Sequence, residues 1–254
     1  MTRPPAGSSG SPPLPRSGAR WARRVLAAGG AAALLVAALG AWYLFLRPPG
    51  PPPVDLVALP GASAAGTTSP GALDGVWTLE PVSASGANSS SFVGYRVQEQ
   101  LAGIGAHTAV GRTGGVTGSF TLRGTTVIAG AITADLATLK SNEPLRDAQL
   151  VHRGLQTALY PTATFLLTRP IDLGGLPAPG VLVRADATGR LTLHGQTRTV
   201  TIPLQARLAG RTVEVAGSLT IAFADYGIIP PTSFIALSVA NHGILELRLV
   251  FAHT

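Results

Sequence analysis

The chain contains no cysteine among its 254 residues. A disulfide framework, a thiol nucleophile and a zinc or iron–sulfur site with cysteine ligands are therefore excluded. Other patterns of catalytic chemistry are also missing, because there is no G-x-S-x-G motif and no H-x-H or HExxH spacing. We expect no catalytic residue, no metal site and no cofactor. The five histidines are His107, His152, His194, His242 and His253.

Charge is scarce, at 12% of the residues, and the basic residues are unevenly placed. The formal net charge is +7, but the first 47 residues hold six arginines and no acidic residue. The remainder carries 13 basic and 12 acidic side chains, a net charge of +1. Such a nearly neutral domain lacks the basic surface that binds phosphate backbones, so we expect no nucleic-acid partner. The six arginines are Arg3, Arg16, Arg20, Arg23, Arg24 and Arg47.

One long uncharged run stands near the N-terminus, at residues 25–46, VLAAGGAAALLVAALGAWYLFL. As a helix it would reach roughly 33 Å, enough to cross a hydrocarbon core of about 30 Å. Trp42 and Tyr43 lie near its end, and arginines precede it. The run therefore predicts a single transmembrane anchor with a cytoplasmic N-terminus and an extracytoplasmic remainder. The alternative is a cleaved signal peptide with its cleavage site at residues 38–40.

Composition divides the rest of the chain. Residues 1–24 are rich in Pro, Gly, Ser and Arg without apolar periodicity, which predicts a disordered cytoplasmic tail. Residues 47–73 are rich first in Pro and then in Gly, Ser and Ala, which predicts a flexible linker of about 27 residues, stiffer at its Pro-rich start. The globular domain is expected at residues 74–254.

Alternation of apolar and polar residues dominates that domain. In residues 189–204, GRLTLHGQTRTVTIPL, it continues on both sides of a short turn, which is typical of a hairpin with one buried face. Leucines at helical spacing and Pro144 near the first turn predict one helix at 143–158. The pattern thus favours an all-β antiparallel fold with one short helix. Strands are expected at 92–99, 117–122, 127–136, 163–169, 181–194, 199–208, 213–223 and 244–251.

Four motifs follow each other in a specific order: LRDAQL at 145–150, YPTATF at 160–165, the hairpin at 189–204 and ADYGI at 224–228. Together they resemble the YceI-like family, from about Gly75 to the C-terminus. The resemblance implies an eight-stranded antiparallel barrel of lipocalin-like shape that binds a long isoprenoid lipid in its interior. The chain departs from the family pattern at 94–101, which lacks an early histidine, and before ADYGI, where an arginine is usual.

The interior of an eight-stranded barrel is either filled by side chains or holds one slim ligand. Few bulky aromatic residues are present to fill it, which suits an elongated aliphatic guest. The alternative is a solid core made of the same side chains. The residues expected to line a cavity are Tyr95, Val97, Phe120, Leu122, Ile128, Ile132, Phe165, Leu167, Leu191, Leu193, Val200, Ile202, Leu219, Ile221, Phe223, Leu245, Leu247 and Leu249.

A polar cluster is expected at the barrel rim, formed by the neighbours Arg146 and Asp147 and by Asp225 and Tyr226. These side chains could hold a ligand headgroup. We favour a structural role, in which Arg146 and Asp225 form an ion pair that holds the helix against the barrel and Tyr226 covers the barrel end. His194, at a predicted turn, is expected to satisfy backbone groups.

These observations favour a membrane-tethered, extracytoplasmic protein that binds or carries an isoprenoid-type lipid and is not an enzyme. One alternative is a surface interaction module with a filled barrel. Another is a helper in isoprenoid-quinone redox chemistry, which needs a polar cluster inside the cavity. The ligand headgroup, a monomeric or homodimeric state, and the role of the Gly-rich insert at 102–118 as a lid stay open. Candidates for the redox cluster are Tyr95, Arg96, Glu99 and Asp225.

Overall fold

The computed structural model describes residues 34–35, 50–56, 71, 73–80, 91–103, 105–209, 211–231 and 236–254. Of the predicted anchor at 25–46, only Leu34 and Leu35 are among them, and both are helical. Within the described residues, no helix combines the length and apolar character needed to span a membrane. The anchor therefore stays a prediction, and Pro49–Thr254, which forms one compact unit, is the part considered below.

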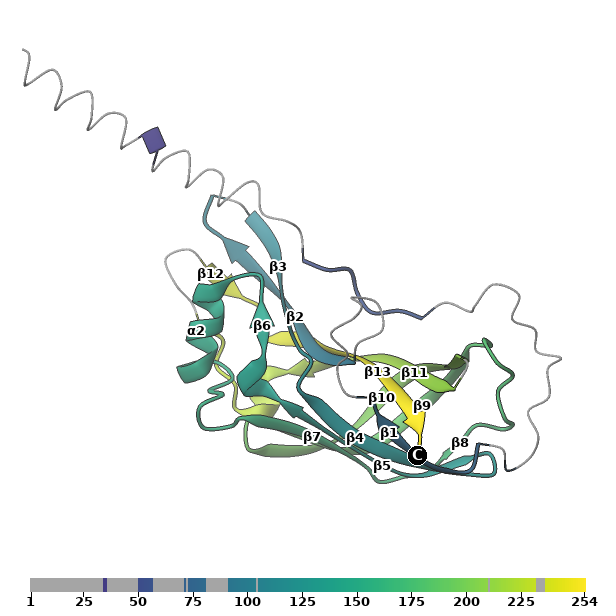
Figure 1. Cartoon of the computed structure of the whole chain (residues 1–254). Coiled ribbons are helices and arrows are strands. Elements are labelled where there is room, and N and C mark those ends of the chain that lie inside the picture. The colour runs from purple at the N-terminus through teal and green to yellow at the C-terminus, as the bar shows by residue number, and fades with distance from the viewer. Residues whose placement is uncertain are drawn as a thin grey trace, which may run out of the picture. The chain divides into compact units, whose positions relative to one another are not determined.

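Eight antiparallel strands close into a ring, which confirms the predicted eight-stranded barrel (Figure 1). Seven of the expected strands lie in the ring, but the one expected at 92–99 lies beside it and an unpredicted strand at 75–79 completes the ring. The ring closes where the first and last strands pair, with Trp77 opposite His253. In ring order the strands are β1 (Gly75–Leu79), β4 (Val116–Arg123), β5 (Thr126–Asp135), β7 (Thr162–Leu167), β9 (Val183–Leu193), β10 (Gln196–Ala209), β11 (Thr212–Ala222) and β13 (His242–His253).

A second hairpin extends the sheet beyond the ring. β2 (Phe92–Leu101) pairs with the first half of β13, as β1 pairs with its second half. β3 (Gly105–Thr113) pairs with β2, so most of the Gly-rich insert at 102–118 is strand and not a lid. Gly111 is required there, because a Cβ atom would lie 2.5 Å from Cε1 of Tyr95. Short strands flank this sheet: β6 (Lys140–Ser141) on β3, β12 (Ala236–Val239) on β2 and β8 (Ile171–Asp172) on β5.

The hairpin at 189–204 forms as predicted, by β9 and β10. Leu193 pairs with Gln196, which leaves His194 and Gly195 as a two-residue turn. Both have positive φ, 51° and 72°, the geometry of the type I′ turn that suits the twist of a hairpin. The apolar side chains of one face, including Leu191 and Leu193, are buried.

The predicted helix at 143–158 is shorter in the structure, where α2 spans Pro144–His152. The Glu143 side chain caps its start by accepting a hydrogen bond from the Leu145 amide. The helix ends at His152, and Gly154, just beyond the capping residue Arg153, has a φ of +61° that is incompatible with continuation. The predicted extension to residue 158 is wrong because the backbone turns there.

Two short 3₁₀ helices, η1 (Leu136–Thr138) and η2 (Phe223–Tyr226), lie with α2 at one end of the barrel. Apolar side chains fill that end. The opposite end carries β8 and the C-terminus (Figure 1). The buried side chains of the filled end include Leu136, Leu139, Leu193, Ile221, Tyr226 and Ile228.

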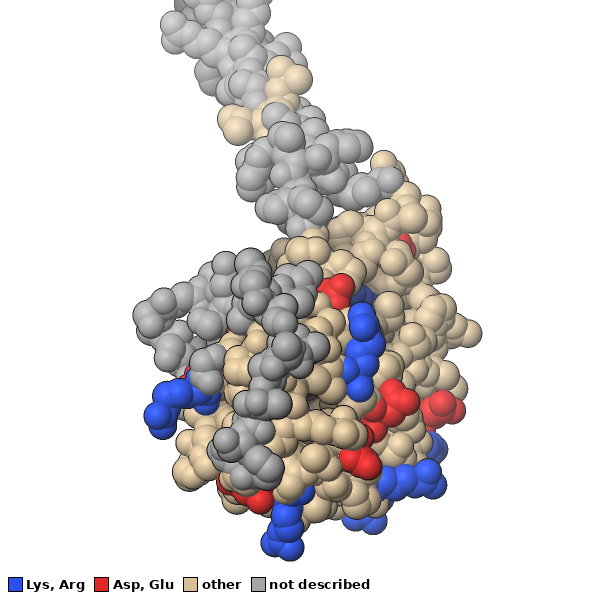
Figure 2. All heavy atoms as spheres, turned by 90° about the vertical axis from the view of Figure 1, so that its right-hand side faces the viewer, with Lys and Arg blue, Asp and Glu red and all other residues tan. Residues whose placement is uncertain are grey.

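On the face that Figure 2 presents, basic and acidic side chains are interspersed between uncharged ones.

Candidate ligand cavity

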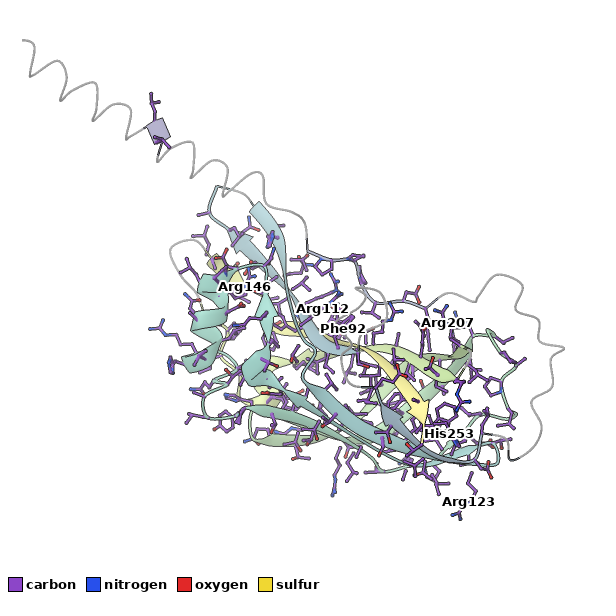
Figure 3. All side chains as sticks on the ribbon, in the orientation of Figure 1. Phe92, Arg112, Arg123, Arg146, Arg207 and His253 are labelled. Atoms are coloured by element: carbon purple, nitrogen blue, oxygen red, sulfur yellow. The ribbon has the colours of Figure 1, made fainter. Side chains whose placement is uncertain are left out.

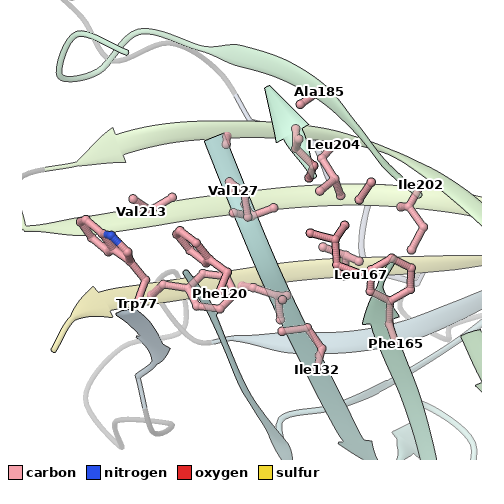
Figure 4. Close-up of a pocket in the computed structure, with 18 of the residues that line it drawn as sticks. Trp77, Phe120, Val127, Ile132, Phe165, Leu167, Ala185, Ile202, Leu204 and Val213 are labelled. Carbon is pink, nitrogen blue, oxygen red and sulfur yellow. The ribbon is translucent and has the colours of Figure 1, made fainter. Parts of the chain in front are cut away.

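An apolar cavity of about 230 Å³ lies inside the barrel (Figure 4). For comparison, an engineered apolar cavity of about 150 Å³ is large enough to bind benzene. Side chains from β1, β4, β5, β7, β9, β10, β11 and β13 all contribute to its lining. The barrel core is therefore hollow along part of its length.

The cavity exists because several inward positions carry very small residues. Ala185 and Ala187 on β9, Ala206 on β10, Gly130 on β5 and Ala163 on β7 all line it. Alternate residues of a strand point to the same face, so a small residue at these positions leaves space inside the barrel. These small residues were not predicted, because the apolar alternation that indicates the strands is most visible at bulky side chains. The signal that could have found them is an alanine at every second position, as in 185–187.

Aromatic side chains form the wall of the cavity next to β1. The rings of Trp77 and Phe120 are stacked with centroids 5.9 Å apart, and Phe120 meets Phe251 edge-on at 4.9 Å. The Trp77 indole N–H donates to the Leu73 carbonyl at 3.0 Å, which satisfies the polar atom of a side chain that is 2% exposed. His253 packs edge-on against Trp77. This cluster forms a rigid wall of the cavity.

Phe165 on β7 forms part of the opposite wall (Figure 4). Its ring lies over Gly189, where a Cβ atom would come within 2.5 Å of the ring. Glycine at this position of β9 therefore allows the phenyl ring to lie flat across the neighbouring strand.

Eleven of the eighteen predicted residues line the cavity. They come from every cavity-forming strand except β1, on which no lining residue was predicted. These residues are Phe120, Leu122, Ile132, Phe165, Leu167, Leu191, Ile202, Leu219, Leu245, Leu247 and Leu249.

The other seven lie outside the cavity. Leu193 and Ile221 are buried in the hydrophobic core, and Tyr95, Val200 and Phe223 are partly buried and pack against this core. Val97 lies beside Gly243, close to Phe223.

Ile128 lies on the outer surface and is 40% exposed. A bulge between β4 and β5 pairs Thr121 with Ala129 but Leu122 with Val127. The extra residue shifts the alternation, so Val127 points inward in its place.

The predicted ion pair between Arg146 and Asp225 is wrong. Arg146 instead meets Glu99, at 2.5 Å, because α2 lies beside the β2–β3 hairpin (Figure 3). Asp147 accepts hydrogen bonds from the backbone and side chain of Ser141, and Asp225 is exposed. Tyr226 is 2% exposed and lies in the filled end, as expected for a side chain that covers it. The four residues thus form no single cluster.

The redox candidates are dispersed as well. Arg96 points outward to Glu246, at 2.7 Å, and Glu99 also contacts His107 at 3.1 Å. The Tyr95 hydroxyl is buried without a hydrogen-bond partner among the described residues. Burial raises the pKa of this phenol above its usual value, with Asp147 and Glu99 adding to the effect and Arg146 opposing it. No residue of this group lines the cavity.

His194 joins two segments at the filled end of the barrel. Its Nδ1 donates to the Tyr226 carbonyl at 2.9 Å, and its Nε2 lies 2.8 Å from the Gln156 side-chain amide. The imidazole of His194 therefore satisfies a backbone group, as expected. That group belongs to η2 and not to the turn that contains His194. Within the part of the chain that the structure describes, no group of three His, Asp or Glu side chains could hold a metal ion.

Comparison with solved structures shows the same fold in a polyisoprenoid binding domain from Saccharophagus degradans, at 19% identity and a TM-score of 0.53. That match covers 70% of this chain and 98% of the other. BcnA from Burkholderia cenocepacia has 22% identity and a TM-score of 0.49, with 63% of this chain and 95% of the other covered. A YceI protein from Campylobacter jejuni has 16% identity and a TM-score of 0.45, with 57% and 84% covered.

A search of curated proteins gave no match. The family model of the YceI-like domain, by contrast, matches residues 82–251. This match spans most of the chain and includes six strands of the ring in full and most of β13, but not β1. The chain belongs to the YceI-like family.

Proposed function

We propose that this protein binds a long-chain isoprenoid or a similar amphiphilic lipid in its barrel and carries it near a membrane. The observation that carries the proposal is the cavity, which is lined by aliphatic and aromatic side chains from every strand of the ring. Burial of apolar surface contributes about 25 cal/mol per Å², so a hydrocarbon chain needs no strong polar contact to be retained. The polyisoprenoid binding domain named above is a relative of the same fold.

Binding without catalysis suits the site. Its lining offers hydrocarbon contacts, whereas the polar residues considered for redox chemistry point elsewhere. The hollow interior also disfavours an interaction module built on a filled barrel.

The proposed location is extracytoplasmic, with residues 25–46 as a retained anchor. The proposal rests on the length of the apolar run and on the arginines that precede it. A tethered barrel stays close to the bilayer from which a lipid ligand would be taken.

Native mass spectrometry of residues 49–254, purified from a bacterial host, tests the binding proposal. We expect a co-purifying species of isoprenoid mass at near one molecule per barrel. A bare protein mass that also fails to take up added polyprenols or quinones would contradict it.

A cavity-filling variant makes this experiment specific. Ala185→Leu combined with Ala206→Leu places two larger side chains in the cavity, so we expect the lipid mass to disappear while the protein stays folded. Ala129→Leu is the matched control, because Ala129 is exposed on β5 and its enlargement leaves the cavity unchanged. Equal lipid retention by the double variant and the control would place the ligand outside the barrel.

A further inference from the structure

Residues 50–56, GPPPVDL, belong to the stretch whose composition predicts a flexible linker, yet they pack against the outside of the barrel. Leu56 is only 4% exposed. Val110 on β3, beyond the ring, is also buried, and so are two outward positions of the barrel, Ala216 on β11 and Val250 on β13. Outward side chains of a barrel ordinarily face water, so the burial of these residues means that other parts of the chain cover them.

The contacts match what a run of prolines can offer. Pro51, Pro52 and Pro53 have carbonyl acceptors but no backbone N–H, and extended proline segments make no internal hydrogen bonds. A guanidinium group has donors only. Arg96 donates to the Pro51 carbonyl, and Arg112 donates to the Pro52 carbonyl at 3.1 Å. The guanidinium groups, which can only donate hydrogen bonds, therefore bind to proline residues, whose backbone can only accept them.

Glu246 holds both guanidinium groups in place. Its carboxylate accepts from Nε of Arg96 at 2.7 Å and from Nε of Arg112 at 2.8 Å. Glu246 is 2% exposed, so a buried carboxylate lies between two partly exposed guanidinium groups. Arg112 also lies over the Phe92 ring, 4.2 Å from its centroid (Figure 3). One terminal nitrogen of each arginine donates to a proline carbonyl.

The end of the segment that follows the prolines is matched in the opposite sense, because there the barrel accepts a hydrogen bond. The Leu56 amide donates to Oε1 of Gln205 on β10, at 2.9 Å. At the other end Gly50 lies against Val110, and a Cβ atom there would be 2.9 Å from a Val110 methyl group. The surface therefore presents donors to the prolines and an acceptor to the amide that follows them, which sets the direction of the bound chain.

We infer that Arg96, Arg112 and Gln205 form a docking surface on the outside of the barrel for an extended, proline-rich segment, and that residues 50–56 of this chain occupy it. This part of the linker, residues 50–56, then belongs to the domain. Only residues 47–49 connect the apolar run at 25–46 to the docked segment. This inference is independent of the proposed lipid binding.

Spin-label distance measurements on the full chain in detergent test the inference, and the lack of native cysteine makes the labelling clean. Labels at Asp55→Cys and Thr199→Cys, both exposed positions, report where the segment lies on the barrel. We expect a single narrow distance distribution. A broad distribution in the otherwise native chain would overturn the inference.

The clamp variant combines Arg112→Ala with Gln205→Ala and leaves the Arg96–Glu246 pair in place. We expect it to lose the narrow distance between positions 55 and 199. A second label pair, at Ala129→Cys and Thr199→Cys on the barrel itself, should keep its distribution and so verify the fold. The matched control is Arg198→Ala with Gln196→Ala, which removes the same side-chain types from exposed positions of β10. A narrow 55–199 distance that survives in the clamp variant would overturn the role of these residues.

Discussion

At the scale of single residues, the inward positions of the barrel combine aliphatic side chains with a few large rings and a few very small side chains. Phe165 can extend across β9 only because Gly189 lies beneath it. Ala185 and Ala206 leave open the space that larger residues would fill. Cavity shape is thus set by a few positions at which size matters more than polarity.

Gly189→Ala should destabilise the fold by ~1–3 kcal/mol, the usual cost of overpacking a filled site. The new methyl group would collide with the Phe165 ring and the Leu166 carbonyl. Gly130→Ala is the control, because its nearest neighbour would be 3.6 Å away, in ordinary contact. Urea unfolding of the two variants measures the difference, and equal stabilities would refute the close approach.

Tyr95→Phe should raise the free energy of unfolding by about 1 kcal/mol, since an unpaired buried polar group is destabilising. The hydroxyl that it removes has no partner among the described residues. Urea unfolding at neutral pH measures the effect. A loss of stability on substitution would mean that the hydroxyl makes a favourable interaction.

The same side chain predicts a loss of stability at alkaline pH. Burial keeps the pKa of Tyr95 in the folded protein above the value of about 10 for an unfolded chain. Above pH 10 the unfolded chain therefore releases a proton that the native state retains, and stability falls as pH rises further. Tyr95→Phe should reduce this decline in unfolding experiments between pH 9 and 11, whereas an unchanged slope would assign the decline to other groups.

At the scale of elements, α2 is attached mainly through polar contacts. No residue of the helix is fully buried, although Leu150 packs against the core. The Arg146–Glu99 ion pair joins the helix to β2, and the Asp147–Ser141 hydrogen bonds join it to β6. The attachment of α2 to the hairpin therefore depends on charge pairing.

Arg146→Ala should destabilise the protein by about 3 kcal/mol, because it leaves the buried Glu99 carboxylate without its guanidinium partner. Combining it with Glu99→Ala should recover part of that loss, since the unpaired charge is then removed. A double-mutant cycle from urea unfolding measures the coupling. Additive effects of the two substitutions would show that the pair is not coupled.

At the scale of the whole molecule, a ligand enclosed by all eight strands should stabilise the entire barrel. Binding to the native state alone adds about 2.7 kcal/mol at a free ligand concentration 100 times the dissociation constant. Delipidated protein should therefore melt at a lower temperature than loaded protein, and added polyprenol should restore the difference. Identical melting curves in calorimetry would argue against an interior ligand.

The regular parts of this barrel could be predicted from the chain alone. Period-two alternation and the turn at His194 and Gly195 identify the β9–β10 hairpin, because the pleat of a strand and the twist of a hairpin are local properties. The motifs at 145–150, 160–165 and 224–228 indicated the family. β3 was missed because its glycines resemble a loop, whereas in the structure Gly111 accommodates the ring of Tyr95.

The sequence by itself determined the antiparallel strands, the helix and most of the large side chains around the cavity, because these follow from the periodicity of apolar residues along each element. The closed barrel was implied by the resemblance to the YceI-like family. Only the tertiary structure decided which residues meet across strands. It placed Arg146 against Glu99, turned Ile128 outward through a bulge and brought the prolines of the linker to Arg96 and Arg112. Such pairings join residues far apart in the chain, and they depend on register and closure, which periodicity does not encode.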